Sequence, residues 1–231
     1  MQERSNEIKS KEITSQLSKD YTASKELSKD FSKELSSGAE AIIYLNRNKN
    51  VDKVRVKKTY RIPEIDNTLR FSRTRKEAKM LEKITKLIPA PKLLSQKEDS
   101  IEMGFIDGIQ LKKILDKKPR FALLVGKNLA ILHDNNIIHG DLTTSNMIFK
   151  EERLKDDELY FIDFGLSFTS SKIEDMAVDI HLFKQALESK HFKIAELAYK
   201  NFLKAYNPKN KKEILNRLKI VEQRGRYKEK N

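Results

Sequence analysis

The spacing of apolar residues changes along the chain from one typical of strands to one typical of helices. In the first half, short apolar runs of strand length lie at residues 35–45, 51–60, 93–94 and 101–106. Gly38 places a tight turn inside the first run. Residues 67–87 instead carry apolar positions at helical spacing, and Pro89 ends that segment because proline interrupts the helical ladder. The pattern predicts a small antiparallel sheet with one helix.

After Gly108 the pattern becomes mainly helical. Segments of helical periodicity lie at residues 111–115, 121–134, 174–188, 192–205 and 213–221. Two short apolar runs, Ile137–Ile138 and Tyr160–Ile162, interrupt these segments and are predicted as strands. A sheet followed by helices, with a hinge near Gly104–Gly108, indicates an α+β fold of two lobes with a cleft between them.

The ends of the chain are predicted to lie outside these lobes, which we place at residues 35–106 and 107–221. Residues 1–34 repeat Ser-Lys-Glu or Ser-Lys-Asp without Gly or Pro. We interpret them as a polar linker or a solvated helix. Residues 222–231 are predicted to form a basic C-terminal tail.

Composition narrows the class of protein. Hydrophobic residues make up 38% of the 231 residues, enough for a globular core. No apolar run approaches the ~20 residues that a membrane helix needs. The absence of cysteine excludes disulfides and thiolate metal sites, and the polar N-terminus predicts no secretory signal. We expect a cytoplasmic protein that does not bind membranes.

The net charge of +13 arises from 47 Lys and Arg residues against 34 Asp and Glu residues. Residues 51–79 and 207–231 each carry an excess of six positive charges (10 − 4 and 9 − 3), so most of the excess lies in two segments. Such segments suit the phosphates of a nucleotide or a nucleic acid. A solvated surface that binds no ligand would have the same composition.

Two loops carry the candidate chemistry. The HGD loop, residues 139–146, follows the apolar pair Ile137–Ile138, and the DFG loop, residues 163–167, follows Tyr160–Ile162. Protein kinases use such a pair of loops, in this order and with these residue types, to hold a magnesium nucleotide. A loop cap or a salt bridge would explain one aspartate but not the whole arrangement. The sequence therefore predicts a kinase-like fold.

Phosphoryl transfer requires phosphates held in line, metal to neutralise charge, and a group that orients the nucleophile. We predict that Asp141 is the base that orients the acceptor hydroxyl or water. Asn146 and Asp163 supply hard oxygen ligands, which suit Mg²⁺ bound together with ATP.

A kinase also needs a lysine on the third strand and a helix glutamate that holds it. Glu77 is the candidate glutamate. Lys53, Arg55 and Lys57 share one face of the predicted strand because side chains alternate along a strand. We favour Lys53, which lies early enough in the strand to face the phosphates, and keep Lys57 as the alternative. Solvated strand charges would give the same pattern.

Further ATP contacts are expected from the first turn and from the hinge. The turn has one glycine and is a poor glycine-rich loop, but it precedes the lysine strand, so its backbone amides could cover the phosphates. The hinge would offer backbone groups to adenine. The residues in question are Gly38, Ala39 and Glu40 in the turn and Met103, Gly104 and Ile106 in the hinge.

Two departures from an ordinary protein kinase are visible. Gly140 stands where regulated kinases have an arginine that pairs with an activation-loop phosphate, so we expect no control by that route. Only 68 residues follow Asp163 (231 − 163), and no Ala-Pro-Glu occurs among them. A lobe for a peptide substrate is therefore largely missing, and we predict a minimal kinase.

Several stretches together resemble the small Rio-like atypical Ser/Thr kinases of the KEOPS complex. They are residues 38–41, 60–66, 73–78, 139–146 and 163–168, and the resemblance covers residue 35 to about residue 228. It supports Lys53 as the strand lysine. It also implies that Asp179 and His139 support the HGD loop, and that the tail contacts tRNA through Arg224, Arg226 and Lys228.

The resemblance implies a function within an assembly. Such kinases partner a threonylcarbamoyl transferase of the TsaD/Kae type and other small KEOPS subunits, in forming N6-threonylcarbamoyladenosine on tRNAs that read ANN codons. They act as Ser/Thr kinases or ATPases. Some archaeal relatives are fused behind the transferase, and we interpret residues 1–34 as a linker of that kind.

Two other functions are compatible with parts of the pattern. Small-molecule kinases of the aminoglycoside or choline type also carry His-Gly-Asp loops, but they bind cationic substrates, which the basic composition disfavours. A pseudokinase scaffold would explain the single-glycine loop, although the catalytic and metal-binding candidates are all present.

Overall fold

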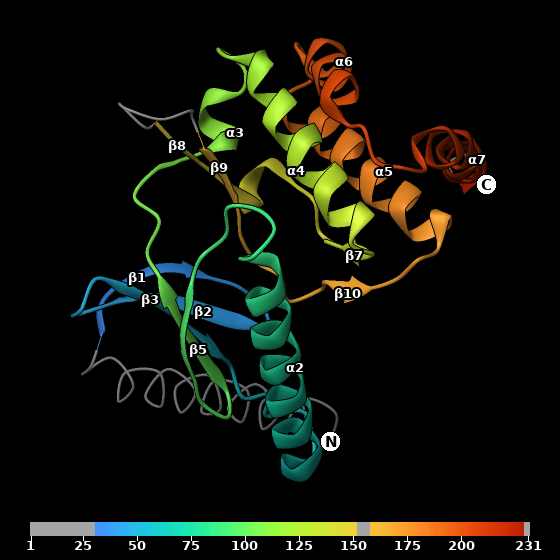
Figure 1. Ribbon diagram of the computed structural model, residues 1–231. Coiled ribbons are helices and arrows are strands. Elements are labelled where there is room, and N and C mark those ends of the chain that lie inside the picture. The colour runs from blue at the N-terminus through green and yellow to red at the C-terminus, as the bar shows by residue number, and fades with distance from the viewer. Residues whose placement is uncertain (1–30, 152–157, 229–231) are drawn as a thin grey trace, which may run out of the picture. The chain divides into compact units, whose positions relative to one another are not determined.

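The computed structural model describes residues 31–151 and 158–228, with side chains except those of residues 31–32 and 225–228 (Figure 1). The chain forms two compact units. Unit 1 comprises Met1–Arg75 and Leu94–Phe105, and unit 2 comprises Lys76–Leu93 and Ile106–Asn231. Within the described residues, no helix has the length and hydrophobicity needed to cross a membrane. Residues 1–30 of the predicted linker lie outside the described residues.

Unit 1 contains a five-stranded sheet in the order β1-β2-β3-β5-β4. Its strands are β1 (Phe31–Ser37), β2 (Ala41–Asn46), β3 (Asn50–Arg55), β4 (Leu93–Gln96) and β5 (Ser100–Gly104). β1 pairs antiparallel with β2, β2 with β3, and β3 with β5. The predicted turn lies between β1 and β2, where the Gly38 amide donates to the Ala41 carbonyl at 3.0 Å.

Two predicted boundaries in unit 1 are wrong. β1 begins at Phe31, inside the segment interpreted as linker. The strand predicted over residues 51–60 ends at Arg55. The chain leaves the sheet there because Pro63 begins α2 (Pro63–Ile84), and proline fits the first turn of a helix, whose amides have no partner within it.

The first half of α2 is fixed to unit 1 by a buried carboxylate. Asp66 accepts hydrogen bonds from Arg70 Nε at 2.8 Å and from the Lys58 amide at 3.3 Å. Arg70 also donates to Asp99, at 2.7 Å, between β4 and β5. Burial acts to raise the pKa of Asp66, but these hydrogen bonds and the arginine charges outweigh it and hold the pKa below its ordinary value.

Unit 2 is mainly helical, with a buried core of apolar side chains contributed by every long helix. Its helices are α3 (Leu111–Ile114), α4 (Ala122–Asp134), α5 (Ile173–Lys190), α6 (Ala195–Ala205) and α7 (Lys211–Lys228). Its short strands are β6 (Ile109–Gln110), β7 (Ile137–Ile138), β8 (Met147–Lys150), β9 (Glu158–Phe161) and β10 (Phe168–Thr169). They form the sheets β6-β8-β9 and β10-β7. The second half of α2 belongs to this unit and buries Leu81 and Ile84.

The last helix is longer than predicted. The sequence predicts that it ends at Val221, before a free tail, but α7 continues to Lys228. Its apolar side, with Ile214 and Leu218, is buried. Ion pairs join it to α5, because the Glu174 carboxylate lies 3.0 Å from Arg217 and 2.7 Å from Arg224.

Gly126 permits a close approach of α4 to the end of α6. A Cβ atom at this position would lie 2.3 Å from the Phe202 carbonyl oxygen and 2.9 Å from the Tyr206 amide nitrogen. Both neighbours are backbone atoms, which cannot move aside as the end of a flexible side chain can. The side-by-side packing of the helices in Figure 1 therefore requires glycine at this position.

We predict that Gly126→Ala lowers the free energy of unfolding by about 2–3 kcal/mol, because an added methyl group forces the helices apart. Denaturant unfolding followed by circular dichroism measures this change. Gly38→Ala is the matched control, since its Cβ would meet its nearest neighbour at an ordinary 3.5 Å. Equal stability of Gly126→Ala and the wild type would contradict the assigned packing.

Candidate active site

The HGD loop begins directly after β7, whose two isoleucines are buried in unit 2. β7 pairs with β10, which follows the DFG loop, so the two loops lie side by side. Ser167 joins them, because its hydroxyl donates to the His139 carbonyl at 2.7 Å. Each loop is thus fixed at its end next to the small sheet.

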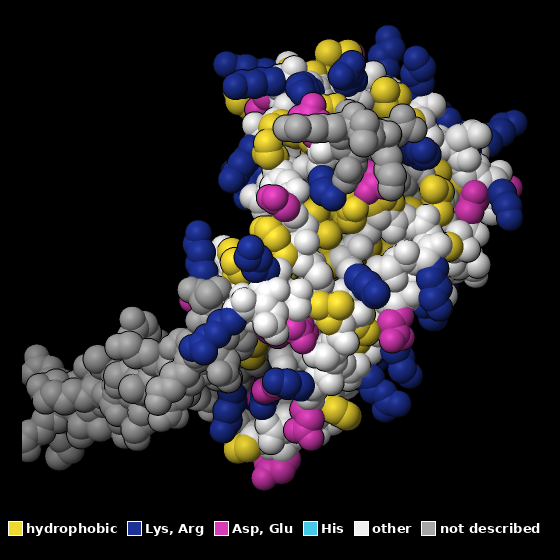
Figure 2. Space-filling view, turned by 60° about the vertical axis from the view of Figure 1, so that its left-hand side comes forward, with side chains coloured by type: hydrophobic (Ala, Val, Ile, Leu, Met, Phe, Trp, Pro, Cys, Tyr) yellow, Lys and Arg dark blue, Asp and Glu magenta, His cyan; other side chains and the backbone are white. Residues whose placement is uncertain are grey.

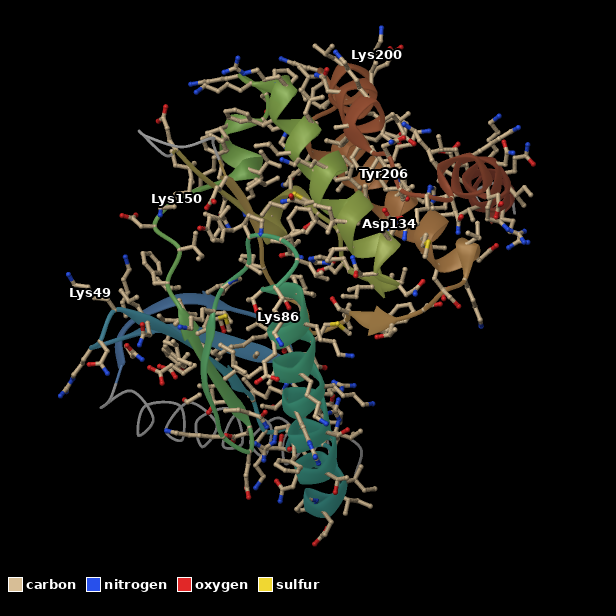
Figure 3. All side chains as sticks on the ribbon, in the orientation of Figure 1. Lys49, Lys86, Asp134, Lys150, Lys200 and Tyr206 are labelled. Carbon is tan, nitrogen blue, oxygen red and sulfur yellow. The ribbon has the colours of Figure 1, made fainter. Side chains whose placement is uncertain are left out.

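The carboxylate of Asp179, on α5, holds the start of the HGD loop. It accepts hydrogen bonds from the backbone amides of His139 and Gly140, at 2.7 and 2.9 Å. His133 Nε2 lies 3.4 Å from this carboxylate, and the Tyr206 hydroxyl lies 2.7 Å from the other ring nitrogen of His133. Tyr206, which follows α6, is labelled in Figure 3. These contacts are those that a supporting role for Asp179 requires.

Electrostatics agree with an ionised Asp179. Burial of this carboxyl acts to raise its pKa, but the hydrogen bonds that it accepts and the nearby histidines hold the pKa below its ordinary value. Burial lowers the pKa of the His139 imidazole, although the carboxylates around it act in the opposite direction. A neutral His139 follows, and its Nδ1 can accept the Asp141 amide, which lies 3.3 Å away.

Gly140 is required by the backbone, independently of any regulatory role. Its φ of 81° lies in the left-handed region, which side chains other than glycine rarely adopt. A Cβ atom there would also lie 2.5 Å from the Leu166 carbonyl oxygen. An arginine at this position is therefore excluded by geometry in this arrangement of the two loops.

Asp141 and Asn146 lie in direct contact across the HGD loop. The Asn146 side-chain nitrogen donates to Asp141 Oδ2 at 2.8 Å and to the Asp141 carbonyl at 3.0 Å. Because the nitrogen faces Asp141, the side-chain oxygen of Asn146 points elsewhere and remains suited to a cation. The other carboxylate oxygen of Asp141 can accept a proton from a nucleophile.

A hairpin brings Asp163 to Asn146. β8 and β9 pair with Met147 opposite Phe161, and the Ile162 amide donates to the Asn146 carbonyl at 3.0 Å. Asp163 follows immediately, with a φ of 63° that is uncommon for aspartate. Such a backbone is found at functional sites more often than elsewhere, and Asp163 is solvent-exposed.

The donor set of this corner fits Mg²⁺ with a nucleotide. Asn146 supplies an amide oxygen and Asp163 a carboxylate, and Mg²⁺ is commonly held by one or two protein oxygens together with phosphates and water. In the described ranges, no group of three or more His, Asp or Glu side chains could hold a metal by itself. The arrangement therefore favours a metal that arrives with phosphates over a resident structural ion.

The lysine candidates are distinguished by their place in unit 1. Lys53 lies on β3 with only 7% of its surface exposed, whereas Lys57 lies beyond the end of the strand and is exposed. A buried lysine is rare unless it interacts with a partner or ligand. Glu77, the candidate partner, is in the middle of α2 and 5% exposed, and belongs to unit 2.

The turn before β2 uses its polar groups differently from a glycine-rich loop. The Gly38 amide is engaged with Ala41, and the Ala39 carbonyl accepts Lys58 Nζ. The Glu40 side chain pairs with Arg73 on α2, a contact that sequence reasoning missed. Of the three predicted phosphate contacts, the Gly38 amide is therefore already satisfied within the turn.

The predicted adenine contacts fall on both units. Met103 and Gly104 are the last residues of β5, where they pair with Val51 and Asn50 of β3. Ile106 is the first residue of this stretch in unit 2, so the chain passes between the units at the predicted hinge.

The predicted tRNA contacts lie on α7 and not on a free tail. Arg224 is exposed and bound to Glu174. Arg226 and Lys228 belong to the helix, but their side chains lie outside the described ones. Figure 2 shows Lys and Arg side chains spread over the face that it presents, and not gathered in one patch.

Sequence reasoning missed two histidines that act on the HGD loop. His133 lies on α4 and contacts Asp179, as described above, and the buried His191 contacts Thr144 inside the loop at 3.0 Å. Each contact joins residues more than 40 positions apart. The sequence offers no signal for these contacts, because neither burial nor long-range pairing can be read from a single sequence.

We predict that the stability of the protein falls as the pH is lowered from about 7.5 to about 5, in part through His139. The folded pKa of this histidine is below its unfolded value, so the unfolded state binds the extra proton first, and stability is lost as pH falls below about 6.5. Thermal unfolding should show a smaller loss in His139→Asn. If the melting temperatures of the wild type and His139→Asn fall in parallel as the pH is lowered, a group other than His139 causes the loss of stability.

The chain is similar in sequence and in fold to proteins of a known family. A family model for the RIO domain matches residues 40–185. The KEOPS complex subunit Bud32 of Pyrococcus abyssi is 39% identical over 218 residues, which are 85% of this chain and 97% of that protein.

A probable bifunctional tRNA threonylcarbamoyladenosine biosynthesis protein of Methanosarcina acetivorans is 36% identical over 200 residues. That match covers 84% of this chain but only 35% of the relative, so the chain spans about a third of its length.

A solved structure shares the fold. The Rio2 kinase of Chaetomium thermophilum, in a complex with ADP, Mg²⁺ and phosphoaspartate, matches with a TM-score of 0.59 and 15% identity, over 86% of this chain and 72% of that one. The two relatives found by sequence share far more identical residues with this chain, 39% and 36%. With a family model matching more than half of its length and a relative matched almost from end to end, this chain belongs to the RIO-domain family and, within it, to the group of KEOPS Bud32 subunits.

Proposed function

We propose that this protein transfers the terminal phosphoryl group of Mg-ATP to a Ser or Thr hydroxyl or to water. The observation that carries the proposal is the corner formed by Asp141, Asn146 and Asp163, where a base and two hard oxygen ligands lie on adjacent loops. The solved Rio2 complex with ADP and Mg²⁺ supports it at the level of the fold.

Each residue has a distinct task in this proposal. Asp141 orients the attacking hydroxyl and takes its proton, while the Asn146 amide holds Asp141 in place. Asn146 and Asp163 would hold Mg²⁺, which neutralises charge on the phosphates when bound. Asp179 keeps the HGD loop in position without contacting the reacting atoms.

The remaining contacts to ATP are proposed to come from the residues that the sequence singles out outside the two loops. Lys53 would neutralise phosphate charge and Glu77 would orient Lys53, as in other kinase-like folds. Backbone groups of Gly104 and Ile106 would bond adenine, with Met103 behind it. The backbone amides of Ala39 and Glu40 would cover the phosphates.

We further propose that the protein works inside a KEOPS-type assembly, with a TsaD/Kae-type transferase and other small subunits. The assembly as a whole would form N6-threonylcarbamoyladenosine on tRNAs that read ANN codons. The names of the relatives support this role, since one is called a KEOPS subunit and the other a tRNA threonylcarbamoyladenosine biosynthesis protein. The reducing environment of the cytoplasm suits a chain without cysteine.

The first test measures ATP turnover by the protein together with its transferase partner. Asp141→Ala should lower kcat by about 10²–10⁴-fold, the usual contribution of a positioned base. Lys53→Met should also abolish most turnover, whereas Lys57→Met, on an exposed lysine outside β3, should keep it. Turnover that survives both Asp141→Ala and Asp163→Ala would show that this corner is not the site.

The second test concerns RNA and the basic end of α7. We expect Arg224→Gln with Arg226→Gln to weaken tRNA binding and to flatten its dependence on salt, by about one unit of slope for each lost phosphate contact. Glu174→Gln is the opposite control, because it frees Arg217 and Arg224 from their ion pair. Filter binding over a salt series measures both effects. Unchanged affinity and slope would identify these arginines as helix-packing residues only.

A further inference from the structure

The second half of the HGD loop is held by a buried histidine that the proposed chemistry does not use. The Thr144 hydroxyl lies 3.0 Å from His191 Nε2, and His191 Nδ1 lies 2.9 Å from Asp116 Oδ1. His191 follows the C-terminus of α5, where its amide bonds the Leu187 carbonyl at 2.8 Å. Asp116 follows α3. Three separate segments of unit 2 therefore meet at this ring.

The hydrogen bonds of the ring have one consistent arrangement when it is neutral. The Asp116 carboxylate can only accept, so the ring proton lies on Nδ1. Nε2 then accepts the hydrogen bond from the Thr144 hydroxyl. Asp116 thus fixes both the tautomer and the orientation of His191, in the way that a carboxylate orients a metal-binding or catalytic histidine.

This Asp-His-Thr order is that of a nucleophilic triad, but its burial excludes that function. Thr144 is 1% exposed, so no substrate can reach its hydroxyl. The exposed end is Asp116, with 60% of its side chain accessible. A nucleophilic triad has the reverse exposure, with an open hydroxyl and a buried carboxylate. The contact therefore acts on the position of the loop.

Thr144 is close to a metal-binding candidate in a short stretch of rigid backbone. Thr144–Asn146 forms a single turn of 3-10 helix, and the Asn146 amide bonds the Thr143 carbonyl at 3.0 Å. A rotation of this turn would move the Asn146 side chain away from Asp141 and away from the DFG loop. The Thr144 hydroxyl joins this turn to His191, directly after α5.

We propose that Asp116 and His191, acting through Thr144, are positioning residues that set the Mg²⁺ affinity of the site by fixing Asn146. The inference rests on the proposed function, since it assigns a metal to Asn146. It adds that the α5–α6 junction, more than 40 residues from the loop in sequence, helps to determine how tightly that metal binds.

The test compares Thr144→Val, which removes the hydroxyl at nearly constant volume, with Thr144→Ser, which keeps it. Isothermal titration measures the affinity for ADP with Mg²⁺ and, separately, with a chelator. We expect Thr144→Val to weaken Mg²⁺-dependent binding about tenfold, as loss of an outer support of a metal ligand does. Binding of metal-free ADP should stay unchanged, and Thr144→Ser should restore the Mg²⁺ dependence.

A second set of variants approaches the same ring from its other side. His191→Phe keeps an aromatic ring at this position but removes both contacts, and it should weaken Mg²⁺-dependent ADP binding as much as Thr144→Val does. Combining the two should cost no more than either alone, because they act through one hydrogen bond. Lys117→Ala, beside Asp116 on the exposed surface, is the control and should bind as the wild type does.

The outcomes separate this inference from the proposed function. One contrary result is that ADP binding depends equally on Mg²⁺ in the wild type and in Thr144→Val, while the variant melts at a lower temperature. That result would show that the hydrogen bond only stabilises the fold, and it would overturn this inference but not the proposed function. A wild-type protein that binds ADP equally with and without Mg²⁺ would overturn both. If the combined variant loses as much Mg²⁺-dependent ADP affinity as the two single variants together, His191 does not act through Thr144, and the inference is overturned as well.

Discussion

The buried carboxylate of Asp179 is the contact on which the geometry of the site depends. It accepts two consecutive backbone amides at the start of the HGD loop, groups that would otherwise lack a partner in the core of unit 2. An unpaired amide in such a place costs about 1–3 kcal/mol. The start of the loop, including the left-handed Gly140, is thus stabilised from α5, in addition to the hydrogen bonds within the loop.

The same helix reaches the other end of the loop. His191 follows α5 twelve residues after Asp179, which corresponds to about 18 Å along a helix. Asp179 fixes residues 139–140 and His191 fixes Thr144, so one rigid element spans the loop between its base and its metal-binding candidate. Because α7 is joined to the start of α5 by Glu174, the basic end of the chain belongs to the same framework.

Much of this fold could be predicted because its signals are local. The helical periodicities, Pro89 after α2 and the two apolar runs before the loops each depend on neighbours in sequence. The continuation of α7 could not be predicted in this way, because its basic composition resembles that of a solvated tail. Arg217 and Arg224 lie seven residues apart, on one side of the helix, and only α5 supplies the carboxylate that both of them bind. The contacts of His133 and His191 escaped prediction for the same reason, since a single sequence gives no record of long-range pairing.

Gly140 has a consequence for how regulation could arise in this family. The chain cannot gain the arginine of phosphorylation-controlled kinases by one substitution, because any side chain at this position would meet both an unfavourable backbone and the Leu166 carbonyl. The backbone around Leu166 would have to move before any side chain could occupy this position. A change from this arrangement to activation-loop control therefore needs at least two coupled changes, one in the backbone next to the DFG residues and one at Gly140.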